Sequence, residues 1–315
     1  MSLGRYVLTR ISVAVPVLLG VTALTFSFIH ALPGDPIDAL VGFRSVSPAT
    51  EASIRAEYHL DRPLWEQYLL WLRNVLVLEF GESPVTGRNV AATVGRRLPA
   101  TLALGGAAWL LALAIGVPTG IVAAVRRGGP ADELSRLAAL AGIATPNFWL
   151  GLVLLLVFGV RLGWVRVIPP DAPLASPAMA KFMLLPTITL GTASAAVVTR
   201  LLRSSMIAEL DAAYVRTARA KGLRERTVIL KHVLRNALLP VVTITGLQLA
   251  FLIDGAVVVE RIFSWPGMGR LLVRSILQRD YPVIQAGVLL VGVSIVLANL
   301  LVDIVYAVLD PRIRY

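Results

Sequence analysis

Six apolar segments, spread along a chain of 315 residues, constrain its fold more than any other feature. They lie at about 11–32, 100–125, 137–160, 184–204, 237–259 and 283–308. A helix of about 20 apolar residues crosses the ~30 Å hydrocarbon core of a bilayer and satisfies its own backbone hydrogen bonds there. The sequence therefore predicts an all-α, polytopic membrane protein with six transmembrane helices.

The composition supports this interpretation. The chain is 57% hydrophobic and 16% charged, with a mean hydropathy of +0.75. Its net charge of +11 raises the question of nucleic acid, but the basic residues lie between apolar segments and no aromatic residues alternate with them. We therefore expect a membrane domain surrounded by lipid, and no nucleic-acid partner. The absence of cysteine excludes disulfides and Cys-ligated metals.

Residues 63–81 are apolar enough to suggest a further span, but they also contain Glu66, Arg73 and Glu79. Apolar residues recur there at a spacing of three to four, which predicts an amphipathic helix lying on a membrane surface or on a protein. We expect residues 1–99 to form the first span and a long extracytoplasmic loop that carries this helix. Residues 100–315 are expected to form a five-span core with a cytoplasmic loop at 205–236.

The distribution of basic residues predicts the orientation. Nine of them lie between Arg200 and Arg235, and loops rich in Lys and Arg stay in the cytoplasm. With six spans, both termini are then cytoplasmic. Two groups of basic residues are exceptions to this rule. In the predicted orientation, the extracytoplasmic side contains Arg96, Arg97 and the arginines at 261–279.

Several catalytic and binding motifs are missing. No segment matches G-x-x-x-x-G-K-[ST], so the chain is not expected to bind ATP through a phosphate-binding loop. The three histidines lie in separate regions without the spacing of metal ligands. Two acids, Asp254 and Asp303, fall well inside predicted spans without a catalytic motif around them. We therefore expect neither an enzyme nor a metal or other cofactor bound by this chain.

The stretch "DAAYVRTARAKGLRERTVILKHVLRNALLP" at 211–240 stands out from this apolar background. Tyr214, Ala218 and Lys221 share a helical face, small residues keep the helix slim, and Gly222 can end it. Such a rod fits a groove in a soluble partner. The alternative is a basic loop whose charges only determine topology.

"RTARAKG" at 216–222 resembles the E-A-A-x-x-x-G loop of the membrane subunits of ABC importers, with Ala218 and Gly222 matching and Arg216 and Thr217 replacing its first two residues. Further segments resemble the first permease of the dipeptide/oligopeptide/nickel importer family along nearly the whole chain. These segments are "LPGDP" at 32–36, "YHLDRPLWEQYLLWL" at 58–72, "TPNFWLG" at 145–151, "FSWPGMG" at 263–269, "RDYPVIQ" at 279–285 and "LDPRIR" at 309–314.

The resemblance implies a type I ABC importer permease fold and one half of a translocation path for dipeptides or oligopeptides. The expected location is the plasma membrane of a prokaryote. The expected partners are a second permease, two cytoplasmic ATPases that use ATP and Mg²⁺, and an extracytoplasmic substrate-binding protein. The helix within 63–81 is either a dock or lid for that binding protein or a passive scaffold. Nickel chelates and glutathione remain alternative substrates, and a channel or secondary transporter independent of ATP is the alternative class. The residues expected to couple the chain to the ATPases are Tyr214, Arg216, Thr217, Ala218, Arg219, Ala220, Lys221 and Gly222. Ala218 and Ala220 would allow close approach, and Arg219 or Lys221 would pair with acids of the partner.

Asp254 lies 14 residues beyond Pro240, which is roughly 21 Å along a helix and in the outer half of a span. An acid in lipid is unfavourable by about 2.5 to 3.5 kcal/mol, so we expect a basic partner or a cavity. One interpretation is an ion pair with Arg270 or Arg274. The other is a position on the translocation path that attracts a positively charged substrate group.

Overall fold

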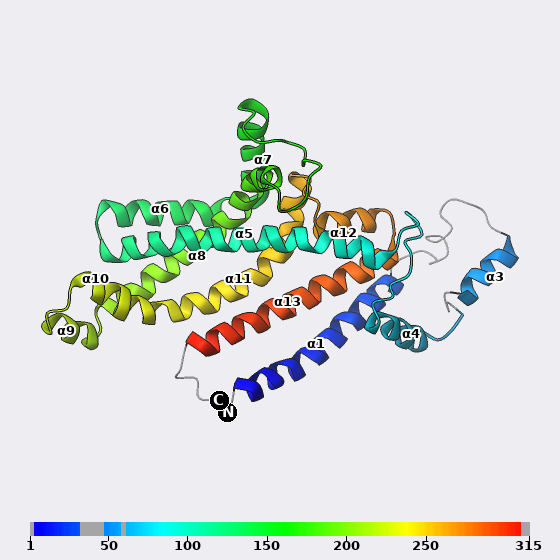
Figure 1. Ribbon diagram of the computed structural model, residues 1–315, viewed down its shortest axis with the longest axis horizontal. Helices are drawn as coiled ribbons and strands as arrows, with labels where there is room; N and C mark the ends of the chain where they lie inside the picture. The colour runs from blue at the N-terminus through cyan, green and yellow to red at the C-terminus, as the bar shows by residue number, and fades with distance from the viewer. Residues whose placement is uncertain (1–2, 32–46, 58–60, 310–315) are drawn as a thin grey trace. The chain divides into compact units, whose positions relative to one another are not determined.

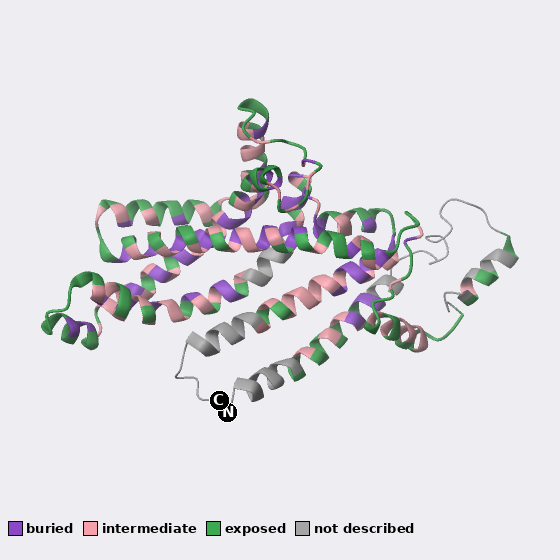
Figure 2. Cartoon of the chain, viewed as in Figure 1, coloured by how far each residue is buried: buried purple, intermediate pink, exposed green. Residues whose placement is uncertain are grey.

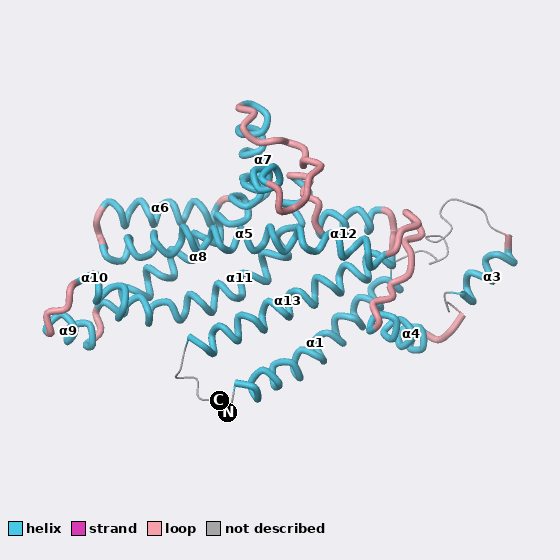
Figure 3. The backbone as a smooth tube through the Cα atoms, viewed as in Figure 1, coloured by secondary structure: helices cyan, strands magenta, loops and turns pink. Residues whose placement is uncertain are grey.

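The computed structural model describes the backbone of residues 3–31, 47–57 and 61–309 and the side chains of most of these residues. The helices are α1 (Leu3–Ala31), α3 (Pro48–Glu57), α4 (Leu64–Leu76), α5 (Val90–Val125), α6 (Pro130–Ala144), α7 (Asn147–Leu154), α8 (Pro177–Leu210), α9 (Ala213–Ala220), α10 (Glu225–Thr227), α11 (Leu234–Ile262), α12 (Met268–Leu277) and α13 (Tyr281–Leu309) (Figure 1). Two π-helical segments, Leu155–Arg161 and Val228–Val233, continue α7 and precede α11. The tube view shows helices joined by loops (Figure 3). The fold is therefore all-α.

The candidate spans agree with the apolar pattern. Four helical stretches of the described residues are long and apolar enough to cross a membrane: Val90–Val125, Pro177–Leu210, Glu225–Gln248 and Tyr281–Leu300. A fifth is counted if the bent pair Pro130–Ala144 and Asn147–Arg161 forms one span. The first predicted segment lies in α1, whose described apolar part covers 12–27. The chain is thus polytopic with four to five candidate spans, and the count of six stays a prediction.

The third predicted span, 137–160, is not one straight helix, and this corrects the expectation from the sequence. It breaks at Thr145 and Pro146, where α6 and the segment beginning with α7 meet at 99°. Proline lacks an N–H group and its ring disfavours the helical conformation of the residue before it. Thr145 accordingly has an extended backbone, with φ −82° and ψ 119°. A proline inside the apolar run therefore turns the chain.

The contacts between residues divide the chain into two compact units, and most of the first unit consists of Thr101–Trp265. Within this unit α8 packs against α6, α7 and α11. Glycines permit the closest approaches, because a Cβ at Gly116 would lie 2.7 Å from the Cβ of Val198, and one at Gly191 would lie 2.9 Å from the carbonyl oxygen of Ala108. Figure 2 shows many buried residues along α8. Small residues therefore let α5 and α8 pack closely, as in other membrane helices.

The second unit comprises Leu8–Ala100 and Pro266–Val296. Its core contains Val90 and Val94 from the start of α5, Met268 from α12, and Val283 and Ala286 from α13. The loop after α4 is tied to this core, because the Ser83 hydroxyl donates a hydrogen bond of 2.6 Å to the buried carboxylate of Asp280.

The helix predicted within 63–81 is α4, whose 13 residues span about 20 Å and are too few to cross the bilayer. One side packs on α1, where Tyr68 and Trp71 contact Phe26 and the Tyr68 hydroxyl lies 2.9 Å from that of Thr22. Trp65 and Leu69 are exposed beside this contact. The prediction of a helix too short to span is confirmed, whereas its apolar face and its role as a dock or lid stay predictions. The division of the chain at 99 and 100 stays a prediction as well.

Candidate functional site

The basic loop between α8 and α11 is the candidate site. Figure 1 shows α9 and α10 together where α8 ends and the chain turns back toward α11. Ala212 has an extended backbone, with φ −70° and ψ 150°, and starts α9 in a new direction. The sequence thus folds into a short helix between two long ones.

One side of α9 packs against its own chain. Val215 is fully buried and Ala218 is 8% exposed, and both join a cluster formed by α8, the π-helical segment before α11, and α11. Val228 and Val233 of the π-helical segment are fully buried in the same cluster, whereas Leu230 between them is exposed. The short helix is therefore held in place by apolar burial.

Gly222 ends α9 with a backbone conformation in the left-handed region, at φ +75°. The N–H of Gly222 bonds to the carbonyl of Arg219 at 2.9 Å, and the N–H of Leu223 bonds to that of Ala218 at 3.4 Å. These two bonds form a Schellman motif, which satisfies carbonyls that a helix end leaves free. The prediction that Gly222 ends the helix is confirmed.

The charge of Arg219 is paired inside the loop. Its guanidinium donates two hydrogen bonds, of 2.7 and 3.1 Å, to the carboxylate of Glu225. This hydrogen bonding raises the pKa of Arg219 above its ordinary value. Both side chains are about half exposed, so the pair adds no more than about 1 kcal/mol to stability. It nevertheless ties the end of α9 to the start of α10.

Tyr214 closes the other end of α9. Its hydroxyl donates a hydrogen bond to the carboxylate of Glu209 at the end of α8. Burial and then this bond raise the pKa of the Tyr214 phenol above its ordinary value, so the hydroxyl remains a donor near neutral pH.

The structure corrects two expectations for this site. Ala218 was expected to offer close approach to a partner, but it faces the chain's own core because the apolar positions of α9 are the ones that bury. Arg219 or Lys221 was expected to pair with an acid of a partner; Arg219 is paired with Glu225 of its own chain, which leaves Lys221 for that role as a prediction. Apart from Tyr214 and Arg219, whose side chains are bonded within the chain, the exposed residues on α9 and at its end are Ala213, Arg216, Thr217, Ala220, Lys221 and Gly222.

A buried ion pair beside the site was missed by sequence reasoning. Arg203 of α8 donates two hydrogen bonds, of 2.5 and 2.8 Å, to Asp132 of α6, which also accepts a bond of 2.9 Å from the N–H of Gly128. Asp132 is 2% exposed. The partners are 71 residues apart, so no local spacing reveals the pair. It joins α6 to α8 at the end of α8 that leads into α9.

Asp254 lies on α11, but its side chain falls outside the described residues. The expected ion pair with Arg270 or Arg274 and the position on the translocation path therefore both stay predictions. The same helix carries a second acid that the sequence analysis passed over. Glu260 is fully buried, and its carboxylate accepts a hydrogen bond of 2.5 Å from the hydroxyl of Thr101 on α5. The apolar run "GAVVVE" before it is the signal that marks it as buried.

The site is thus a rigid helix with a polar, basic outer face, on a chain of membrane spans. Chemically it can contact acidic groups and transmit movement, and the groups described offer no arrangement of nucleophile and base.

Comparison with known proteins agrees with this arrangement. Residues 116–315 match the family described as "Binding-protein-dependent transport system inner membrane component", and residues 3–105 match the N-terminal part of such membrane components. A chain in the inward-facing structures of the MetNI methionine ABC transporter superposes with a TM-score of 0.55 at 16% identity, covering 69% of this chain and 96% of that one. This likeness shows an ABC permease-like fold.

Two curated relatives match the chain at nearly full length. It is 41% identical to the dipeptide transport system permease protein DppB of Escherichia coli (strain K12), over 99% of both chains. It is 44% identical to the glutathione transport system permease protein GsiC of Escherichia coli O1:K1 / APEC, again over 99% of both. With four to five candidate spans, family models that cover both halves, and relatives of this similarity, the chain belongs to the inner-membrane permease components of binding-protein-dependent ABC transport systems.

Proposed function

We propose that this chain is one of two permease subunits of an ATP-driven importer of dipeptides or of glutathione, and that its loop at 213–222 couples it to the ATPases. As an ABC permease, the chain is a multi-pass protein of the bacterial inner membrane and is not itself catalytic. It works in a complex with ATPase subunits, which use ATP.

The observation that carries the substrate assignment is the similarity to two permeases over 99% of their length. Their names specify a dipeptide and glutathione, which are both short peptides with a free ammonium group and carboxylates. A short peptide is therefore the substrate class that both relatives support. The family description also refers to a binding protein, which supports an extracytoplasmic partner for this chain.

The coupling assignment is supported by how α9 is held. Its inner side is buried in the chain's own core, both of its ends are tied to neighbouring segments, and Arg216 and Lys221 point their charges away from that core. Within the described part of the chain these two cations have no ion-pair partner, so acids of an ATPase can pair with them. Exposed pairs contribute about 0 to 1 kcal/mol each, so the shape of the rigid helix must provide most of the coupling.

The remaining parts of the proposal follow from the family resemblance. The second permease completes a type I importer with six spans per subunit, and the ATPases require Mg²⁺. The cytoplasmic location of both termini rests instead on the basic residues between Arg200 and Arg235. Asp254 either lines the translocation path or forms an ion pair. Uptake by complexes that carry Asp254→Asn distinguishes the two roles. If Asp254 lines the path, the variant should take up substrates with a free amino group less well than substrates whose amino group is blocked.

The test is reconstitution of the complete complex in liposomes with its binding protein. We expect uptake of a labelled dipeptide or of glutathione that requires ATP inside the liposome. If ATP hydrolysis is normal and neither substrate enters, the substrate assignment is wrong.

Coupling is tested separately with Arg216→Glu/Lys221→Glu, which reverses both outer charges. We expect assembly to survive and substrate-stimulated ATP hydrolysis to fall several-fold, because the contact with the ATPase becomes repulsive. Arg126→Glu/Arg127→Glu, on the turn before α6, is the matched control. Equal loss in both variants, or none in the first, contradicts the assignment of 213–222.

A further inference from the structure

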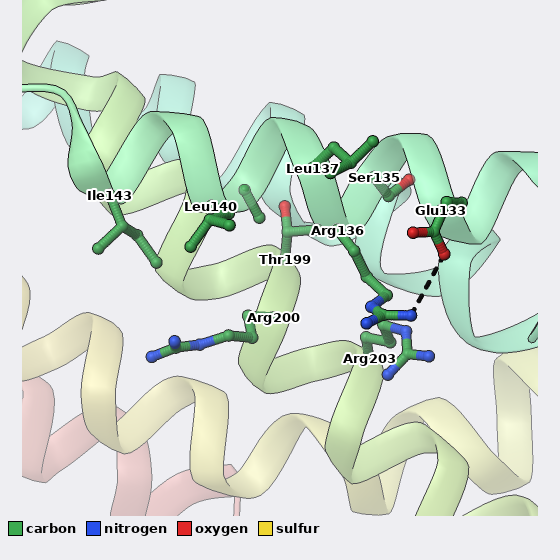
Figure 4. A pocket seen from close by; sticks show the side chains of 10 residues that line it. Glu133, Ser135, Arg136, Leu137, Leu140, Ile143, Thr199, Arg200 and Arg203 are labelled. Carbon is green, nitrogen blue, oxygen red and sulfur yellow. Dashed lines mark hydrogen bonds and ion pairs between the residues drawn. The ribbon is translucent and has the colours of Figure 1, made fainter.

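A cavity of about 350 Å³ lies between α6 and α8, apart from the proposed coupling helix (Figure 4). Arginines line it, with Arg136 from α6 and Arg200 and Arg203 from α8. Leu137, Leu140 and Ile143 of α6 line it as well. The cavity therefore combines cationic and apolar walls.

The cationic side carries more positive than negative charge. Arg203 is neutralised by the buried Asp132, and Arg136 forms a pair of 3.3 Å with Glu133. Both members of that second pair are more than half exposed, so water weakens it. Arg200 is exposed, and the described residues provide it with no hydrogen bond or ion pair. The three guanidinium groups are thus balanced by only two carboxylates, and the remaining positive charge favours an anion in the cavity.

The apolar side extends along α6 beyond Arg136, and Figure 4 shows the Arg200 side chain beside it, below Leu140 and directed toward Ile143. Helix α6 begins at Pro130, so Arg136 lies about 9 Å from its start and Ile143 about 20 Å. Leu137 and Leu140 are 56% and 65% exposed. Because the turn before Pro130 is cytoplasmic in the proposed orientation, Arg136 lies nearer the lipid headgroups, and Leu140 and Ile143 lie deeper, toward the acyl chains.

We propose that this cavity binds an anionic phospholipid of the cytoplasmic leaflet, with its phosphate on Arg136 and on an Arg200 side chain that turns back toward it, and with an acyl chain along Leu137, Leu140 and Ile143. A guanidinium matches a phosphate with two parallel hydrogen bonds. Basic pockets between transmembrane helices on the cytoplasmic side are suited to such headgroups. Inorganic phosphate is one alternative occupant, but it would contact only the arginines and leave the apolar wall uncovered. A helix of the second permease is another, but it would have to bring an acidic side chain to Arg200. A lipid brings both an anion and a hydrocarbon chain to this depth.

The test uses the purified, delipidated complex titrated with dioleoyl phosphatidylglycerol that carries a photoreactive group in one acyl chain. We expect crosslinks to map to the stretch that contains Leu137–Ile143. In Arg136→Gln/Arg200→Gln the lipid concentration for half-maximal crosslinking should rise about 25-fold, since each surface arginine contributes about fivefold. Arg126→Gln/Arg127→Gln removes the same charge from the preceding turn and should change this concentration less than twofold.

Each alternative gives a different outcome. Crosslinks that are equally weakened by both double variants, or by neither, overturn the site. Full competition by inorganic phosphate shows a site for phosphate alone, and crosslinks that appear only after the second permease is removed show that this subunit covers the cavity. Leu140→Trp provides a second measurement, because it fills the apolar side of the cavity and leaves the arginines. Loss of crosslinking there supports the lipid, and unchanged crosslinking contradicts it.

Discussion

Gly222 shows how one residue determines the shape of the proposed coupling loop. Its φ of +75° lies in the left-handed region, where a side chain is unfavourable by roughly 1 to 2 kcal/mol, and asparagine is tolerated better than other residues. No atom lies within 4 Å of the position that a Cβ would take. The glycine is therefore required for its backbone and not for space.

We predict that Gly222→Ala lowers the stability of the loop by about 1 kcal/mol and that Gly222→Asn lowers it by less. The alanine variant has to strain φ or lose the Schellman bonds, whereas asparagine adopts the left-handed conformation. Protease cleavage rates within 205–236 of the assembled complex measure this order. Faster cleavage of the asparagine variant than of the alanine variant is inconsistent with a role for φ.

At the scale of elements, the bundle depends on the close approach of α5 and α8. The carbonyl oxygen of Ala195 and the side chain of Val198 would lie 2.7 to 2.8 Å from a Cβ at Gly116. Ten residues earlier on α5, a Cβ at Gly106 would meet nothing within 4 Å. The same substitution therefore has different consequences at two places on one helix.

We predict that Gly116→Ala destabilises the complex by about 1 to 3 kcal/mol, the usual range for an overpacked core. Gly106→Ala should be neutral or stabilising by up to about 1 kcal/mol, because alanine favours helix. Thermal unfolding of the two purified variants compares them directly. Equal melting temperatures show that α5 and α8 do not pack as described.

The apolar pattern predicts elements better than it predicts their faces. The helices over all six segments follow from segment length, and the end of α9 follows from Gly222. The burial of Ala218 does not follow from the sequence, because a helix of eight residues has apolar and small side chains on several sides. The pair of Asp132 with Arg203 joins distant segments, so it depends on packing that local spacing does not encode. The bend at Pro146 could have been predicted from the sequence, because a proline disfavours the helical conformation of the residue before it.

At the scale of the whole molecule, orientation determines what each loop can meet. The length of α5 helps to explain Arg96 and Arg97, which oppose the positive-inside rule. Its 36 residues extend about 54 Å, much farther than the ~30 Å of hydrocarbon. The helix therefore begins well before the apolar run at about 100, and its first turns lie in water or among headgroups, where charges are tolerated.

We predict that reporter fusions after Arg314 and within the turn at 126–129 report the cytoplasm, whereas a fusion in the turn at 82–88 reports the outside. An even number of spans separates the first two sites, and α5 separates the last two. Alkaline phosphatase activity compared with green fluorescence at each site measures this. The same side for the fusions at 82–88 and 126–129 contradicts α5 as a span.

The tied ends of α9 also determine the thermodynamics of its association. Ordering a flexible segment costs about 1 to 2 kcal/mol per residue in conformational entropy, and the loop has already met this cost through its buried valines, its Schellman motif and the pair of Arg219 with Glu225. A partner that docks on α9 therefore meets a preorganised surface, and little of the interaction energy is lost to folding on contact. For the proposed contact with the ATPase we expect the entropy and heat-capacity signature of two rigid bodies, with movement passed on without first being absorbed by a loose loop.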